Sequence, residues 1–330
     1  MPAIETKGLT RRFGDVVAVD DLDLTIADGE VYGFLGPNGA GKSTTINMLL
    51  DFTPPSSGSA TVLGHDVERE SLAIRQKIGV LPEDFGVYDR LTAKKHVRFA
   101  IDVKGTADDP GALLERVGLA DAADRKAGGF STGMKQRLAF AMALVGEPEL
   151  LILDEPSSGL DPNGVREMRS IIREEVDRGA TVFFSSHIME QVEAICDRVG
   201  ILRDGRLVAE DSIDALKDGF DADSQLVVTV DAVPDGLLAT IEELAGVSGV
   251  TVSGSDIVVS LSDSRRKAAV LGIVEDAGAS IDDITTKEPS LEDLFAALTT
   301  GSLSTDETPA DEPPADEPED DTDRAAEVDA

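Results

Sequence analysis

A glycine-rich segment that directly follows a short apolar run is the feature that most restricts the fold. The run covers residues 31–35 and is expected to form a buried strand. The segment after it fits the pattern G-x-x-x-x-G-K-[ST], in which backbone N–H groups surround phosphate oxygens at the positive start of a helix. A chance glycine-rich turn is the alternative. The residues expected to surround nucleotide phosphates are Gly36, Asn38, Gly39, Ala40, Gly41, Lys42, Ser43 and Thr44.

Two carboxylates after a second apolar run complement this segment. Residues 150–153 are typical of a parallel strand buried on both faces, and Asp154 and Glu155 follow directly. Lys42 is expected to reach the phosphates, and Ser43 and Asp154 to ligate Mg²⁺, which prefers oxygen ligands. Glu155 is then free to act as general base toward the water that attacks the γ-phosphate. An ordinary turn or cap at the end of a strand is the alternative for the two acids.

The order of the apolar runs predicts an α/β fold. Residues 22–26 alternate as in a half-buried strand, and further strands are expected at 78–81 and 181–184. Residues 84–145 are expected to be mostly helical. This alternation of strand and helix gathers ligands at the carboxyl ends of the strands. His187 follows one of these strands, where it could contact the γ-phosphate or the attacking water; an ordinary surface or core histidine is the alternative.

The composition indicates about two domains. The 330 residues include a single cysteine, Cys196, so an intrachain disulfide is impossible and a reducing compartment is expected. The chain starts with polar residues, and it contains no run of about 18 apolar residues such as a membrane span needs. Any role at a membrane is therefore expected to pass through another chain.

The charge balance is strongly acidic, with 64 acidic against 30 basic residues and a net charge of -34. Residues 301–330 hold 12 acidic residues and one arginine, so the other 300 residues still have a net charge of -23. Self-repulsion on this scale is relieved by salt, because the screening length falls to roughly 3 Å at 1 M. We expect adaptation to a salt-rich cytoplasm; a basic partner is the alternative. Direct binding to nucleic acid is not expected.

Residues 130–138 resemble the LSGGQ signature of the ATP-binding cassette (ABC) ATPase family, together with the QR pair that follows it. With the phosphate segment and the two acids, the resemblance extends over roughly residues 3–220. A hydroxyl and glycine N–H groups at the start of a helix form an anion site. The resemblance implies that Ser131 and Gly133 contact the γ-phosphate bound by the opposite subunit, so that hydrolysis requires a dimer.

Three further segments match the family in their order along the chain. Residues 158–161 resemble the D-loop, which implies that Asp161 contributes to nucleotide binding. His187 is similar to the switch histidine of the family. Phe13, placed upstream of the first strands, matches the aromatic residue that stacks on adenine; a core phenylalanine is the alternative.

The chain departs from the family at two places. Glu83 replaces the usual glutamine of the Q-loop; its carboxylate can offer an oxygen to Mg²⁺ or to a water, but adds negative charge beside the phosphates. Thr132 and Met134 replace a glycine and a glutamine of the signature. The phosphate contacts of the signature are expected to survive, and an active ATPase is favoured over a degenerate one.

The composition changes after the first 220 residues. Residues 219–224 are expected to be a linker, and a β-α-β-β-α-β order follows over 225–285, as in ferredoxin-like domains. A short helix is expected near 291–298. The segment 288–295 is similar to the ending of ATP-binding subunits of drug- and antibiotic-type ABC exporters. This region could support dimerisation or regulation, or be a passive appendage, and residues 301–330 are expected to be disordered.

The expected fold is a P-loop NTPase of the ABC ATPase type with an α/β architecture. Its ABC ATP-binding domain spans 1–220 and includes a helical subdomain at about 84–145. A small α+β ferredoxin-like domain spans 225–299, and an acidic tail spans 301–330.

The resemblance implies ATP and Mg²⁺ as cofactors. The expected partners are an integral membrane permease and a second ATP-binding subunit, in a homodimer or a heterodimer, and no nucleic acid. The chain would lie at the cytoplasmic face of the membrane as a peripheral subunit and drive export. One alternative is a soluble ATPase of the same superfamily that acts on ribosomes or DNA. Another is a regulator that only binds nucleotide, which Glu155 and His187 disfavour.

Overall fold

The computed structural model describes residues 1–218, 224–234, 236–287 and 295. The expected linker at 219–223, most of the expected helix at 291–298 and the acidic tail lie outside the described residues. The described chain forms three sheets.

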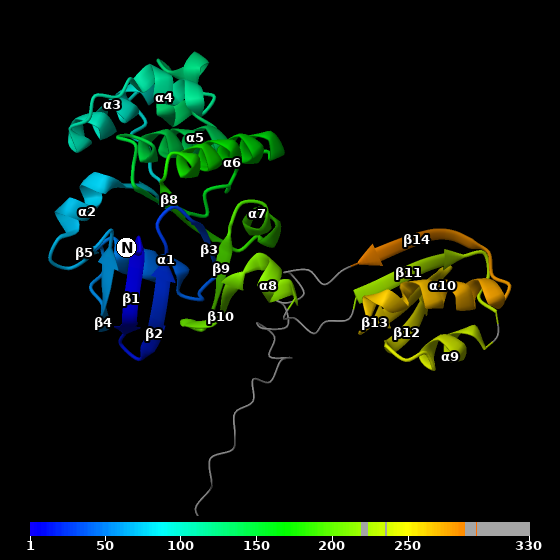
Figure 1. Ribbon diagram of the computed structural model, residues 1–330. Coiled ribbons are helices and arrows are strands. Elements are labelled where there is room, and N and C mark those ends of the chain that lie inside the picture. The colour runs from blue at the N-terminus through cyan, green and yellow to red at the C-terminus, as the bar shows by residue number, and fades with distance from the viewer. Residues whose placement is uncertain (219–223, 235, 288–294, 296–330) are drawn as a thin grey trace, which may run out of the picture.

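A six-stranded sheet lies at the centre of the first unit, in the order β10-β9-β3-β8-β7-β6 (Figure 1). All of its pairings are parallel except that of β10 with β9. The four runs predicted as strands of this sheet are confirmed, and β3 and β7 are buried along their whole length as predicted. The strands are β3 (Val31–Leu35), β6 (Ile78–Leu81), β7 (Leu150–Asp154), β8 (Thr181–Ser186), β9 (Arg198–Arg203) and β10 (Arg206–Ser212).

Parallel pairing brings several chain segments to one edge of this sheet. Leu35 pairs with Ser186, Asp154 with Ser185, and Leu81 with Leu153. The segments that follow β3, β6, β7 and β8 therefore start side by side. These segments carry the residues that the sequence singled out for phosphate and metal binding.

An antiparallel sheet in the order β2-β1-β4-β5 forms a second layer. A cluster of buried apolar side chains lies between the two sheets and includes residues of α1, such as Ile46 and Met48. Leu22, Leu24 and Ile26 of β2 point into this cluster, which confirms the predicted alternation. The strands are β1 (Ile4–Phe13), β2 (Val16–Ile26), β4 (Ser57–Val62) and β5 (His65–Asp66), and α1 spans Lys42–Leu49.

The placement of Phe13 upstream of the first strands was wrong, because Phe13 is the last residue of β1. The register of β1 shifts three times against β2, between Thr6 and Arg12. These irregularities break the two-residue alternation by which a strand is recognised in a sequence. Polar and charged residues of β1 also interrupt its apolar pattern.

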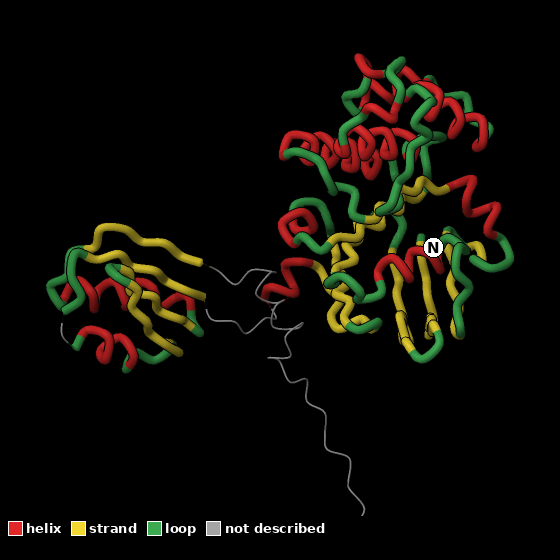
Figure 2. The backbone as a smooth tube through the Cα atoms, turned by 180° about the vertical axis from the view of Figure 1, so that it is seen from behind, coloured by secondary structure: helices red, strands yellow, loops and turns green. Residues whose placement is uncertain are grey.

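Helices of the middle of the chain gather at the end of the unit away from the antiparallel sheet (Figure 2). This region is largely helical, as predicted. Side-chain oxygens of Thr92, Asp109 and Ser131 cap α3, α4 and α5, respectively. The helices are α3 (Ala93–Lys104), α4 (Pro110–Arg116) and α5 (Thr132–Ala143), with 3₁₀ turns at Ala120–Ala122 and Ala127–Gly129.

The remaining helices of the first unit connect its strands. Asp161 caps α6, which begins at Pro162, a residue favoured in the first turn of a helix. Apolar residues of α5, α6 and α7 share one buried cluster with β3, β7 and β8. These helices are α2 (Ser71–Lys77), α6 (Pro162–Asp177), α7 (Met189–Glu193) and α8 (Ile213–Asp218).

The third sheet belongs to the C-terminal part of the chain and has the order β12-β13-β11-β14, with antiparallel pairing throughout. Residues of α9 and α10 share a separate apolar cluster with this sheet. Its elements are β11 (Ser224–Val230), α9 (Leu237–Glu242), β12 (Val247–Ser253), β13 (Asp256–Leu261), a 3₁₀ turn (Ser264–Arg266), α10 (Lys267–Asp276) and β14 (Ile281–Lys287). Among the described residues, no helix combines the length and the apolar character that crossing a membrane requires.

Gly79 in β6 allows the end of α5 to approach the central sheet. A Cβ at this position would lie 2.0 Å from the carbonyl oxygen of Ala143. We expect Gly79→Ala to lower the free energy of unfolding by about 1–3 kcal/mol, because backbone must shift to relieve the contact. Urea unfolding of the full chain measures this. Gly86→Ala is the control, since a Cβ there meets nothing within 4 Å; equal effects of the two variants would contradict the prediction.

Candidate functional site

The loop between β3 and α1 has the backbone geometry of a phosphate-binding loop. Gly41 has a φ of 110°, and a Cβ there would lie 2.4 Å from the carbonyl oxygen of Ala18. Gly39 also has a positive φ, of 85°. No side chain caps the start of α1, so its first N–H groups suit an anion. The loop therefore requires glycine for both conformation and space.

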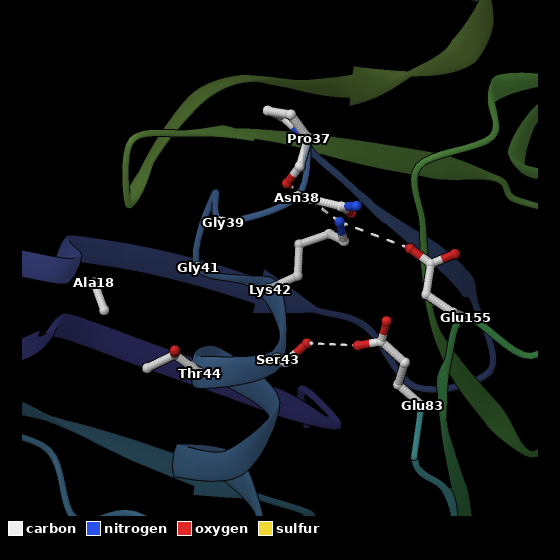
Figure 3. A pocket seen from close by; sticks show the side chains of 10 residues that line it. All are labelled: Ala18, Pro37, Asn38, Gly39, Gly41, Lys42, Ser43, Thr44, Glu83 and Glu155. Carbon is white, nitrogen blue, oxygen red and sulfur yellow. Dashed lines mark hydrogen bonds and ion pairs between the residues drawn. The ribbon is translucent and has the colours of Figure 1, made fainter. Parts of the chain in front are cut away.

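Lys42 reaches across the loop toward the end of β7 (Figure 3). Its Nζ donates a hydrogen bond to the carbonyl oxygen of Gly36 at 2.7 Å and lies 3.7 Å from Oε1 of Glu155. Both side chains are buried, where an uncompensated charge is unfavourable. The ammonium and the carboxylate therefore stabilise each other. The pocket at the loop is lined by Ala18, Pro37, Asn38, Gly39, Gly41, Lys42, Ser43, Thr44, Glu83 and Glu155.

Glu155 is held on both its main chain and its side chain. Its φ is 47°, a conformation that non-glycine residues rarely adopt and that costs about 1–3 kcal/mol. The N–H donates to the carbonyl oxygen and to the hydroxyl of Ser185, each at 3.2 Å. The carboxylate lies 2.9 Å from Nδ1 of His187 and 3.5 Å from the hydroxyl of Ser186. The side chain of His187 is 52 % exposed, so the pair links the buried carboxylate to the surface.

Asp154 occupies a different environment from its neighbour. It is 5 % exposed and accepts a hydrogen bond from the hydroxyl of Ser185. Burial raises the pKa of Asp154 above its usual value; the Ser185 hydrogen bond opposes this rise, and the nearby charges of Glu83 and Glu155 add to it. A bound cation would relieve the unfavourable charge.

The donor set around Asp154 fits Mg²⁺. The hydroxyl of Ser43 donates to Oε2 of Glu83 at 3.4 Å (Figure 3), and the charge of Glu83 acts on Asp154. All three residues offer oxygen. Mg²⁺ is commonly held by one or two carboxylates with phosphate and water completing its shell. The described part of the chain contains no cluster of three or more histidine, cysteine or acidic residues suited to a metal.

Phe13 lies at the surface rather than in the core. It is 49 % exposed, and the guanidinium carbon of Arg11 lies 4.5 Å from the centre of its ring. The alternative of a core phenylalanine is therefore wrong. Phe13 is not among the residues that line the described pocket, and stacking on adenine stays a prediction.

The signature residues form a second group that does not line this pocket. Ser131 accepts a hydrogen bond from the N–H of Met134 as the N-cap of α5. A Cβ on Gly133 would lie 2.8 Å from the carbonyl oxygen of Gly159. Asp161 accepts from the N–H of Gly164, so its carboxylate caps α6 within its own subunit. The structure thus divides the predicted site residues into two groups.

Sequence reasoning missed the supporting roles of Gln136, Ser185 and Ser186. Gln136 donates to the carbonyl oxygen of Pro156, and the two serines contact Asp154 and Glu155. The signals were present in the QR pair after the signature and in the serines before His187. Neither pattern shows which atoms its side chains reach.

Comparisons with known proteins find relatives of this chain. The sequence model of the family described as "ABC transporter" matches residues 19–158. The linearmycin resistance ATP-binding protein LnrL of Bacillus subtilis is 33% identical over 91% of this chain and 99% of that protein. The bacitracin transport ATP-binding protein BcrA of Bacillus licheniformis is 36% identical over 90% and 97%. A dimeric ATP-binding cassette in a post-hydrolysis state, bound to ADP and Pi, is 25% identical with a TM-score of 0.59, over 63% of this chain and 98% of that one.

The raised pKa of Asp154 predicts that its ionised carboxylate lowers the stability of the fold and is needed for activity. The folded chain favours the protonated form of Asp154. Ionisation of this side chain therefore lowers the free energy of unfolding as the pH rises from its pKa in the unfolded chain, about 3.9, through its higher pKa in the folded chain. We expect Asp154→Asn to raise the Tm at neutral pH without Mg²⁺ and to abolish most ATP hydrolysis. The gain in Tm should shrink toward pH 4. A lower Tm for the variant at pH 7 in a scan without metal would contradict the prediction.

Proposed function

The chain belongs to the ABC transporter family of ATP-binding proteins, and from this membership we propose that it couples hydrolysis of MgATP to a separately encoded membrane permease. The observation that carries the catalytic part is the contact of Glu155 with both Lys42 and His187 at the phosphate loop. A base placed beside the phosphate-binding lysine is suited to an attacking water.

The residues at the phosphate loop have separate roles in hydrolysis. The N–H groups of the loop and Lys42 bind the phosphates, and Ser43, Glu83 and Asp154 hold Mg²⁺, which neutralises phosphate charge when bound. Glu155 accepts the proton of the attacking water. His187, within 2.9 Å of that carboxylate, orients it and reaches toward the γ-phosphate from the solvent side.

The second group of site residues supports a dimer. Ser131 and Gly133 at the start of α5 present a hydroxyl and N–H groups outside the pocket of their own subunit. We place them on the γ-phosphate bound by a second ATP-binding subunit, with Asp161 of the D-loop nearby. The partner is a copy of this chain or a relative of it.

The names of the relatives support export as the process that is driven. LnrL is named for linearmycin resistance and BcrA for bacitracin transport. We propose that the helical region docks on the permease at the cytoplasmic face of the membrane. Tyr88, Phe99 and Val103 of this region are large, exposed apolar residues, which is typical of an interaction surface.

The C-terminal part is proposed to be an accessory ferredoxin-like domain over residues 225–299. LnrL and BcrA match 91% and 90% of this chain, which extends the likeness beyond the nucleotide site. Its β-α-β-β-α-β order fits this fold.

The role of Glu155 is tested by Glu155→Gln, which removes the base but keeps the size of the side chain. We expect turnover of MgATP to fall by about 10²- to 10⁴-fold, while ATP binding persists and an ATP-bound dimer accumulates. Phosphate release and size-exclusion chromatography with ATP measure the two effects. Glu147→Gln is the matched control, because Glu147 has the same φ of 47° but lies exposed outside the pocket. Unchanged turnover in Glu155→Gln would refute the assignment.

We also propose that the chain is adapted to high salt, because its net charge is -34. Mutual repulsion of the acidic residues is screened beyond roughly 3 Å in 1 M salt but only beyond about 10 Å in 0.1 M salt. The urea midpoint of unfolding should therefore rise steeply between 0.1 M and 1 M KCl. Full stability and full ATPase activity in dilute buffer would exclude this adaptation.

A further inference from the structure

The side chain of Gln136 is buried where α5, the helix that begins within the signature, contacts the segment after β7. It lies on α5, five residues after Ser131, and is 7 % exposed. Its Nε2 donates to the carbonyl oxygen of Pro156 at 2.9 Å and lies 3.5 Å from the carbonyl oxygen of Glu155. A buried amide requires such partners, because a buried polar group without a hydrogen bond destabilises the fold.

The main chain of Glu155 needs support on both sides. Its left-handed conformation is unfavourable for glutamate. Ser185 of β8 fixes the N–H side, and Gln136 fixes the carbonyl side and the next peptide. The carboxylate is thereby directed toward His187 and Lys42. Loss of either support would let the peptide relax toward a commoner conformation and turn the carboxylate away.

A second close contact joins α5 to the chain beyond Glu155. The backbone of Gly133 approaches the carbonyl oxygen of Gly159 so closely that a Cβ would lie 2.8 Å from it. A Cβ on Gly159 would in turn lie 2.6 Å from the methyl group of Thr132. The first turns of α5 thus contact residues 155–159 at two places, and the same helix carries Ser131.

We propose that Gln136 is a positioning residue for the reaction: it sets the direction of the Glu155 carboxylate from the signature helix of the same subunit. This rests on the proposed function of Glu155 as the base. The amide does not line the pocket and acts through the carbonyl groups of residues 155 and 156. The position of α5 and the direction of the Glu155 carboxylate are then coupled, so that a shift of the helix changes the rate of hydrolysis.

The test replaces the amide with an apolar side chain of similar length in the full chain. We expect Gln136→Met to lower kcat for MgATP by about 10- to 100-fold, because misplacement of a reacting group by an ångström has this effect. The KM and the affinity for ATP should change by less than about threefold, since the phosphate loop is untouched. Parallel losses of Tm, ATP affinity and kcat would instead make Gln136 a packing residue and overturn the proposal.

Lys104→Met is the matched control. Lys104 also donates from a side chain to a main-chain carbonyl, that of Val145, just beyond the opposite end of α5. Its removal takes a comparable polar contact from the same helical region without touching residues 155–159. We expect its kcat to equal that of the unmodified chain; a loss of kcat as large as that of Gln136→Met would overturn the proposal.

A double mutant separates this inference from the proposed base. If Gln136 acts through Glu155, Gln136→Met should lower the residual turnover of Glu155→Gln by less than about twofold, and the ATP-bound dimer should still form. A further loss of 10-fold or more would show that Gln136 acts independently, which refutes the positioning role. Failure of the base assignment is recognised separately, by full turnover in Glu155→Gln alone.

Discussion

Parallel pairing of β3, β7 and β8 is the constraint on which the rest of the site depends. Neighbouring strands lie about 4.8 Å apart, so pairing of Leu35 with Ser186 and of Asp154 with Ser185 starts three separate segments at one edge. A shift of register by one residue would turn every side chain to the opposite face of the sheet. Because all three strands are buried on both faces, packing fixes the register, and the register in turn fixes which side chains meet at the phosphate loop.

Two adjacent carboxylates acquire different chemistry from this arrangement. Asp154 ends β7 with its side chain among hydroxyl and carboxylate oxygens, and burial raises its pKa. Glu155 turns through a left-handed conformation, so its carboxylate meets Lys42 and His187 instead. Different environments can give neighbouring acids different roles. Under the proposed function, a cation suits Asp154 and acceptance of a proton suits Glu155. The unusual φ of Glu155 is therefore the structural origin of the division.

The sequence predicted the features that depend on local pattern. The apolar runs of β3, β6, β7 and β8 and the phosphate loop could be recognised, because a strand buried on both faces and a glycine-rich loop both show in consecutive residues. It failed for β1, where bulges and charged residues remove the alternation and led to misplacement of Phe13. The sequence also did not reveal the role of Gln136. Its partners are main-chain carbonyl groups about 20 residues away, and residue types do not show which main-chain atoms a side chain reaches.

Gly133 illustrates how one residue can satisfy two requirements. Its N–H suits an anion at the start of α5, and its missing side chain admits the carbonyl oxygen of Gly159. Gln136 lies three residues further along the same helix, roughly 4.5 Å along its axis, and bonds to Pro156 at 2.9 Å. A hydrogen bond of this length is lost once its atoms separate beyond about 3.5 Å. Movement of α5 by more than several tenths of an ångström away from β7 therefore disturbs the main chain at Glu155, so the start of α5 and the carboxylate of Glu155 are mechanically coupled.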